Sequence, residues 1–508
     1  MDTSAPPAAS IARSADSDLE LRKLRRHFGR FDILFFLLCT IVGLDTIGTV
    51  AAQGPQAFTW MIVLAVVFFV PCALLCAELG TAFPQEGGPY LWVRLAFGHL
   101  AGAVSNFMYW VTNPVWVGGT LSVTAVTAFT TFFHGGRPLD TLGFYLCALG
   151  FIWFGILAAV LSLRIGKWIP VVGGWARLVL LGLFTVTVLV YAARHGVHGF
   201  GATGFSPGWA GFVALVPVLI FNFVGFELPN SAGDEMVDPQ RDVPFAILRS
   251  GVLAVLLYAL PILGILVVLP VKAVTGLGGF LDAMRQVFIV YGGSTGPDGV
   301  VRLSGAGLVL GDACTVLFIL TLLSSGVAWL MGTDRALAVS GYDGAAPRAL
   351  GVISERFGTP VRVNLLSGLV ASGVLVLAHQ LVGGDPAKLF GAVLSLAVST
   401  TLLSYLGIFP ALSALRRKYP EVPRPYRVRY PRAVGWLLTA LIAFATVELL
   451  LPGLGSDWFG PAYAPSGWAA SERWTYLAVE AVPLVAFVLI AVAFWAAGAS
   501  TRRRSRPS

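Results

Sequence analysis

The chain has 508 residues, of which 56% are hydrophobic and only 12% are charged, and its formal net charge is +8. Soluble proteins carry about 25% charged residues, so this composition excludes an ordinary soluble enzyme and predicts a surface that mostly faces lipid. The basic excess does not indicate nucleic-acid binding, because the basic residues are concentrated in the tails and in alternate loops between apolar segments.

The N-terminal tail, residues 1–30, begins with small and polar residues and then carries six basic residues. Such a composition cannot bury enough apolar surface to fold, so we expect a disordered tail. It has no apolar stretch of the kind found in a cleavable signal peptide.

Twelve apolar stretches follow the tail. A helix needs about 20 apolar residues to cross a bilayer, whereas barrel strands run about 9–11 residues. The stretches are 31–52, 57–83, 99–133, 141–162, 168–193, 208–232, 244–271, 303–334, 361–383, 386–415, 431–453 and 474–498. The sequence therefore predicts an all-α polytopic membrane protein with twelve transmembrane helices.

The first stretch is interrupted by the segment from Gly43 to Gly48, which includes Asp45 and Thr46. Non-helical backbone at membrane depth is tolerated only where it lines a cavity or is buried in protein. A carboxylate at the bilayer centre costs about 2.5–3.5 kcal/mol, so Asp45 needs a partner or a function. It pairs with a substrate amine, carries a coupled proton, or caps the backbone of the break.

The third stretch contains Thr112 and Asn113 just before Pro114, a residue that kinks helices. We expect these two polar side chains to face the same cavity as the first break.

The sixth stretch is interrupted in the same way, at Gly225 and Glu227. Two breaks that lie five spans apart predict an inverted repeat, because an odd offset inserts the two units with opposite orientation, and they predict a binding site at the bilayer midplane. The repeats would cover about 31–193 and 208–415 within a transport core at 31–415.

Basic residues are distributed asymmetrically. The two tails and the loops after the even-numbered spans hold 26 of the 34, the other side holds seven, and Arg177 lies inside a span. The positive-inside rule then places both termini in the cytoplasm. The remainder of the chain would be a basic loop with helices 11 and 12, at 416–498, and a C-terminal tail at 499–508.

No cofactor or metal site is expected. Cys72 and Cys76 share a helix face, but two thiols without further ligands make no metal site. The six histidines are scattered, and the clustered ligands or paired nucleophile and base of an enzyme are not found.

Four motifs, which follow one another along the chain, together resemble the motifs of one protein family. They are Ala77-Glu78-Leu79-Gly80 with Phe83-Pro84-Gln85-Glu86-Gly87-Gly88-Pro89-Tyr90, Phe221 to Glu227 with Asp234 to Pro244, Asp343-Gly344 with Pro347 and Gly358-Thr359-Pro360, and Arg424-Pro425-Tyr426. Together, over about residues 31–430, they resemble the amino acid–polyamine–organocation permeases. The resemblance implies the leucine-transporter-type fold, alternating access, and amino acids, polyamines or related small cations as substrates.

The resemblance also suggests roles for single residues. Glu227 resembles the glutamate of arginine–agmatine exchangers and is either a proton carrier or a buried, hydrogen-bonded acid. Phe221 matches an aromatic gate residue and Trp329 a cavity tryptophan, and either one stacks on a substrate cation or only packs.

Arg177 aligns with a position near the sodium site of sodium-coupled relatives, where a fixed cation would replace the ion. The resemblance therefore implies sodium-independent transport. The alternative is that Arg177 extends its charged end to the cytoplasmic interface.

The chemistry of broken helices suits amino acids. Free N–H groups at one cut end attract a carboxylate, and free C=O groups at the other end attract an ammonium. We expect the substrate to contact residues of both breaks, namely Gly43, Asp45, Thr46, Gly48, Phe221, Asn222, Phe223 and Gly225, together with Thr112, Asn113 and Trp329. The family's first break usually has no acid, so Asp45 favours a substrate amine that lacks a carboxylate.

These features predict a secondary active transporter of amino acids or small amines in the plasma membrane, coupled to protons or working by exchange. A sensor or channel that retains the transporter fold is the alternative. The oligomeric state is left open.

Overall fold

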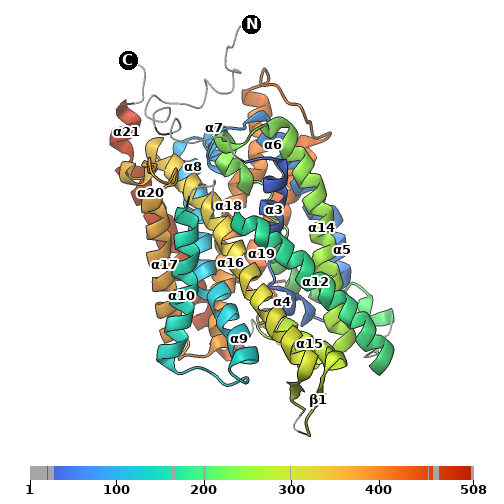
Figure 1. Ribbon diagram of the computed structural model, residues 1–508. Coiled ribbons are helices and arrows are strands. Elements are labelled where there is room, and N and C mark those ends of the chain that lie inside the picture. The colour runs from blue at the N-terminus through green and yellow to red at the C-terminus, as the bar shows by residue number, and fades with distance from the viewer. Residues whose placement is uncertain are drawn as a thin grey trace.

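The computed structural model describes residue 20 and residues 28–161, 168–197, 202–297, 299–455, 457–460 and 468–504. Within these ranges the chain forms a bundle of helices (Figure 1), with α7 and α21 at one end and α15 and strand β1 at the opposite end. Most of the predicted N-terminal tail and the last residues of the C-terminal tail lie outside the described residues.

Ten helical segments in the described part of the chain are long and apolar enough to cross a membrane. They are α5–α6 (Pro55–Ala82), α8–α9 (His99–Phe133), α10 (Thr141–Val160), α12 (Trp168–His195), α14 (Pro239–Val268), α16 (Gly305–Tyr342), α17 (Val361–Leu381), α18 (Pro386–Lys418), α19 (Pro431–Leu450) and α20 (Arg473–Ala497) with the short turn η8 (Ala470–Glu472) before it. The predicted all-α polytopic membrane fold is confirmed.

Two further apolar segments are interrupted, and they are the two for which the sequence predicted breaks. The first consists of α3 (Arg30–Ile41) and α4 (Ile47–Ala51), separated by residues 42–46. The second consists of α13 (Trp209–Asn222) and the 3₁₀ helix η4 (Leu228–Glu235), separated by residues 223–227. Neither pair forms one continuous apolar helix, so the count of twelve spans stays a prediction.

Two of the continuous segments contain a wider, π-helical turn. These turns are η1 (Ala65–Phe69), between α5 (Pro55–Leu64) and α6 (Val70–Ala82), and η2 (Val117–Leu121), between α8 (His99–Trp116) and α9 (Ser122–Phe133). The turn in the third segment begins three residues after Pro114. A proline has no N–H to donate, so the regular hydrogen-bond ladder is disturbed where the sequence predicted a kink.

Some elements were not predicted. The short helix α7 (Gly88–Phe97) follows α6, and the antiparallel strands β1 (Gly293–Thr295) and β2 (Val301–Leu303) precede α16. Helix α15 (Gly279–Phe288) lies between the seventh and eighth predicted stretches. The other short elements are η3 (Ala202–Phe205), η5 (Val271–Ala273), η6 (Ile289–Tyr291), η7 (Arg348–Gly351) and α21 (Ala499–Arg504).

Helix α16 continues to Tyr342, past the predicted end at residue 334. The apolar pattern stops at Thr333, Asp334 and Arg335, but all three side chains are buried against protein. The apolar pattern therefore ends before the helix does, and hydropathy alone gave too short a span.

Helix α8 is at the centre of the packing, in contact with α7, α16, α17, α18 and α20. Helices α3 and α4 pack on α14, and α3 also packs on α12. The two breaks thus lie in the interior. The division into a core at 31–415 and a peripheral part at 416–498 stays a prediction.

Candidate functional site

The first break is held open by a tyrosine. The hydroxyl of Tyr258, on α14, accepts a hydrogen bond from the Gly43 N–H (2.9 Å) and donates one to the Ile41 carbonyl (2.7 Å). These backbone groups have lost their helical partners at the end of α3. Since unpaired backbone groups inside a membrane cost several kcal/mol, Tyr258 stabilises the irregular conformation.

Asp45 lies in this break and is 2% exposed. Trp116 Nε1 on α8 donates a hydrogen bond to Asp45 Oδ2 at 2.8 Å. The second oxygen, Oδ1, is buried and makes no hydrogen bond to any described residue. A Cβ atom on Gly43 would lie 3.0 Å from Oδ1, so this position favours a residue without a side chain. One oxygen of the Asp45 carboxyl group therefore has no hydrogen-bond partner among the described residues.

The second break begins after Asn222 and is linked to the first. Thr46 Oγ1 donates to Asn222 Oδ1 at 2.8 Å. Gly225 has a φ of +121° in the middle of the break, a conformation that favours glycine. A Cβ atom there would also lie 3.2 Å from the Trp329 ring.

Glu227 ends the second break and is fully buried. Tyr109 on α8 donates its hydroxyl proton to Glu227 Oε1 at 2.9 Å, and the Gly225 N–H donates to Oε2 at 3.3 Å. Both oxygens have a partner, in contrast to those of Asp45.

One face of α8 contacts both acids. Tyr109 and Trp116 are seven residues apart, two turns of an α-helix, so they project from the same side. Asp45 and Glu227 therefore lie along one helix, each held by an aromatic donor. Neither these two aromatic residues nor Tyr258 was predicted as part of the site. The seven-residue spacing of Tyr109 and Trp116 is visible in the sequence, but it indicates a role only once the breaks are located beside α8.

Thr112 and Asn113 lie between these two aromatics in the chain. The Thr112 hydroxyl pairs with those of Thr400 (2.8 Å) and Thr401 (3.3 Å) on α18. Asn113 Nδ2 donates to Thr333 Oγ1 on α16 at 2.9 Å. Both polar side chains thus bind neighbouring helices, and their predicted role in substrate contact stays a prediction.

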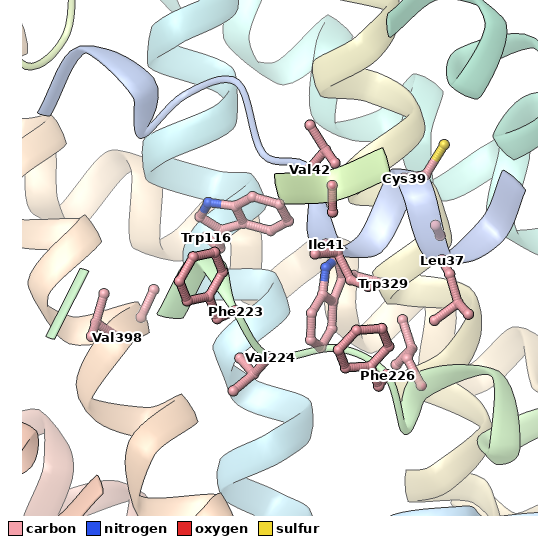
Figure 2. Packing of buried hydrophobic residues seen from close by; sticks show 14 of the residues in the cluster. Leu37, Cys39, Ile41, Val42, Trp116, Phe223, Val224, Phe226, Trp329 and Val398 are labelled. Atoms are coloured by element: carbon pink, nitrogen blue, oxygen red, sulfur yellow. The ribbon is translucent and has the colours of Figure 1, made fainter. Parts of the chain in front are cut away.

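Aromatic residues lie near the breaks, and Figure 2 shows Trp116, Phe223, Phe226 and Trp329 there. The Phe221 ring lies 6.1 Å from that of Trp116, edge to face, and the Trp329 ring lies 6.0 Å from that of Tyr109. Trp329 Nε1 also donates to the Thr40 carbonyl at 2.9 Å, which ties α16 to α3. Phe223 is buried and packs near Tyr258, at 6.3 Å. These rings could stack on a bound cation.

Gly48 has a packing explanation. A Cβ atom on Gly48 would lie 2.5 Å from the Gly276 carbonyl oxygen, in the segment before α15. The structure therefore places Gly48 against the backbone of another segment at the end of the bundle where α15 lies.

Arg177 on α12 is fully buried. Its guanidinium donates to the carbonyls of Val42 (3.0 Å) and Thr321 (2.7 Å) and to Ser324 Oγ (2.8 Å). Further donations reach Cys39 Sγ, the Gly173 carbonyl and Ser325 Oγ. A buried guanidinium does not extend to the membrane interface. Instead it places a fixed positive charge against the first break and within electrostatic range of Asp45.

An acidic cluster lies beyond the second break, at the end of the bundle that holds α7. Arg335 Nε donates to Glu235 Oε1 at 2.7 Å and lies 3.8 Å from Glu86 Oε1. Burial, and then repulsion by Glu235, raise the pKa of Glu86 well above its ordinary value. The cluster therefore links the loop before α7 to η4 and to α16 at this end of the bundle.

Comparisons with known proteins agree on a family. The model of the amino acid permease family matches residues 28–479. The chain is 30% identical to a probable agmatine/putrescine antiporter, AguD, of Lactococcus lactis, over 80% of this chain and 83% of that one. It is 25% identical to the cadaverine/lysine antiporter of Escherichia coli K12, over 68% and 73% of the two chains.

Two more distant similarities extend this picture. The chain is 23% identical to the branched-chain amino acid permease BcaP of Bacillus subtilis, over 80% and 84% of the two chains. Among solved structures, a manganese transporter of Eremococcus coleocola superposes with a TM-score of 0.52 at 12% identity and covers 97% of each chain. At that identity the likeness is evidence of the fold alone.

Proposed function

Since this chain belongs to the amino acid permease family, we propose that it is an exchanger of small amines whose positive end binds Asp45. Membership makes it a membrane transporter and not an enzyme. The choice of substrate, the coupling and the orientation in the membrane are our proposal.

The observation that carries the proposal is the half-satisfied carboxylate of Asp45. Its Oδ1 atom is buried and has no hydrogen-bond partner among the described residues. An unpaired buried charge is costly, so the site gains stability from a bound ammonium or a proton. Trp116 beside the carboxylate adds an aromatic ring to which a cation is attracted.

The position of Asp45 favours an amine over an amino acid. Asp45 directly precedes Thr46 and the first turn of α4, where the free N–H groups of a cut helix would attract a substrate carboxylate. An anion of the protein already lies there. The names of two relatives, which mention agmatine, putrescine and cadaverine, support the same substrate class.

We assign the coupling to exchange or to protons, without sodium. Arg177 supports sodium independence, because its fixed charge lies against the first break. Glu227 supports proton coupling, since a buried acid at this depth exists only if it is neutral or well partnered. We place the protein in the plasma membrane with both termini in the cytoplasm, on the distribution of basic residues.

The test is uptake into liposomes that contain the purified protein. Labelled agmatine, putrescine, cadaverine, lysine and leucine are compared, with and without internal substrate and with and without a pH gradient. We expect saturable uptake of the diamines and of agmatine that is accelerated by internal substrate.

Other outcomes would redirect the proposal. Transport of leucine but not of amines would point to an amino acid permease, as the similarity to BcaP would suggest. Flux that does not saturate would favour a channel, and binding without flux would favour a sensor.

A further inference from the structure

A second buried acid lies far from both breaks, on α20. Glu480 is fully buried, although α20 is otherwise largely exposed on the outer surface of the bundle. Val482, Val485 and Leu489, on the same helix, are between 59% and 66% exposed. Glu480 lies seven residues after the start of α20, about 10 Å along the helix axis. It therefore points inward from a helix that mostly faces lipid.

The carboxyl group of Glu480 has few partners. Ser399 Oγ, on α18, donates to Oε2 at the long distance of 3.4 Å. The other oxygen, Oε1, is buried and makes no hydrogen bond within the described part of the chain. A carboxylate held this weakly would be an almost uncompensated charge in hydrocarbon surroundings.

Asp334, on α16, is a buried acid with a fuller set of hydrogen-bond donors. Its two oxygens accept hydrogen bonds from Trp110 (3.0 Å), Ser367 (2.7 Å) and Asn364 (2.6 Å). Those three donors can compensate a negative charge. Glu480 is as deeply buried, but among the described residues Ser399 is its one hydrogen-bond donor by distance, at 3.4 Å, and the Ser395 hydroxyl also lies close to it.

Titratable groups on α20 and on the helices that pack against it have partners of their own. On α20, the Tyr476 hydroxyl donates to the Leu449 carbonyl (2.9 Å) and pairs with Ser395 Oγ (3.0 Å). On α19, Glu448 Oε2 accepts from the Gly453 N–H (3.1 Å). On α8, His99 and Tyr109 bind Asp343 and Glu227 respectively. Helix α18 contributes the hydroxyls of Ser395 and Ser399, and Arg473 at the start of α20 lies over the rings of Trp458 and Trp474.

No cation among the described residues forms an ion pair with Glu480. We propose that Glu480 is a proton-binding site at the interface of α18 and α20, separate from the acids in the two breaks. In its protonated form the carboxyl group is neutral and has a donor of its own, so it suits this surrounding. Loss of the proton leaves a buried charge, which favours separation of α20 from α18 or entry of water.

Helix α18 connects the Glu480 site to α8 at the centre of the bundle. Ser399 contacts Glu480, and the next two residues, Thr400 and Thr401, contact Thr112 on α8. Proton binding at Glu480 thus acts on the helix that holds α8 on its other side. The consequence is a pH-dependent packing of the outer helix that depends on a group separate from the acids of the two breaks.

The first experiment is infrared spectroscopy on purified protein in lipid, titrated from mildly acidic to mildly alkaline pH. We expect one component of the protonated carboxyl band of the wild type to be lost in Glu480→Gln, while the components of the other buried acids remain. Glu448→Gln, an equivalent change on the neighbouring helix, is the control and should keep that component. A spectrum of Glu480→Gln identical to that of the wild type would overturn the proposal.

The second experiment is thermal unfolding over the same pH range. A buried acid that keeps its proton in the folded state loses stabilisation as pH rises, because the unfolded chain releases that proton more easily. We therefore expect the melting temperature of the wild type to fall with rising pH more steeply than that of Glu480→Gln. Equal slopes would count against the site.

Two further outcomes are decisive. Glu480→Leu is a second neutral variant, and failure of both neutral variants to fold would overturn the proposal, since a neutral group should suffice. If sodium or potassium raises the melting temperature of the wild type but not of Glu480→Gln, and no component of the carboxyl band is lost in that variant, then the site binds a metal cation and the proton assignment is wrong.

Discussion

The two breaks each contain one buried acid, and the two acids are held differently. Asp45 accepts one hydrogen bond, from Trp116, and leaves Oδ1 without a partner in the described structure. Glu227 has a partner for each oxygen, from Tyr109 and from the Gly225 backbone. Both donors on α8 come from the same helix face, so the difference lies in the breaks themselves.

This difference separates two tasks. A carboxylate with an unused oxygen gains a strong hydrogen bond when an ammonium arrives, and the gain is the larger because the group is desolvated. A carboxyl group whose oxygens are both occupied gains less from a new partner. We infer that the first break recognises the substrate and that the second holds a proton or fixes the backbone. The following predictions test that division, from the largest expected effect to the smallest.

Asp45→Asn keeps the size of the side chain and removes its charge. A hydrogen bond to a charged group contributes about 1.5–3 kcal/mol, so substrate affinity should fall roughly tenfold to a hundredfold. Binding to the purified variant, measured by calorimetry, checks this. Asp334→Asn, at a buried acid whose hydrogen bonds are complete, is the control and should bind normally.

Three results for Asp45→Asn are distinguishable. Normal affinity with loss of pH-driven accumulation would make Asp45 the proton carrier. Poor folding with normal affinity in the surviving fraction would make it a structural cap. Wild-type affinity and wild-type pH dependence together would rule out both functional roles.

Trp116→Phe removes the donor that orients Asp45 but leaves the charge in place. We expect affinity to fall about fivefold, equivalent to about 1 kcal/mol for one hydrogen bond. Trp110→Phe makes the same change on the same helix, facing Asp334, and should leave affinity unchanged. Equal losses in the two variants would mean that the effect is general damage to α8.

Glu227→Gln should change affinity by no more than about threefold, less than 1 kcal/mol, because the first break is intact. The amide oxygen can still accept from Tyr109, so we expect the protein to fold. Accumulation driven by a pH gradient should disappear while exchange of internal for external substrate continues. A tenfold loss of affinity would contradict the assignment of substrate recognition to Asp45 and not to Glu227.

Replacement of external sodium by choline at constant pH should leave uptake nearly unchanged. The reason is Arg177, whose guanidinium donates to the Val42 carbonyl beside the first break. The initial rate of uptake into liposomes measures the effect. Loss of most of the transport would show that a sodium ion is needed in spite of the fixed charge.

Much of this architecture is readable in the sequence, since span length and glycine-flanked acids are local properties. Apolar runs predicted the spans, and the breaks were found at 42–46 and 223–227. The partners of the acids are not local: Trp116 is 71 residues from Asp45 and Tyr109 is 118 from Glu227. With 14 tryptophans in the chain, only packing identifies the one that binds an acid.

Polar residues in apolar spans were harder to orient. Thr112 was expected to face a cavity; its hydroxyl pairs with Thr400 on α18, and the contact with substrate stays a prediction. The sequence left two orientations open for the Arg177 side chain, toward the membrane interface or into the bundle. Its inward orientation depends on carbonyl and hydroxyl groups that three helices provide. Glu480, near the start of the last span, carried no motif at all.

The support of the first break also has a consequence for assembly. The groups that satisfy its backbone come from Arg177 on α12 and Tyr258 on α14, which lie 135 and 215 residues further along the chain. During synthesis the first segment enters the membrane before either residue exists. Until they arrive, Val42 and Gly43 must remain helical, be solvated, or be shielded by the insertion machinery. The native form of the first break is therefore completed late, when the later helices have been inserted.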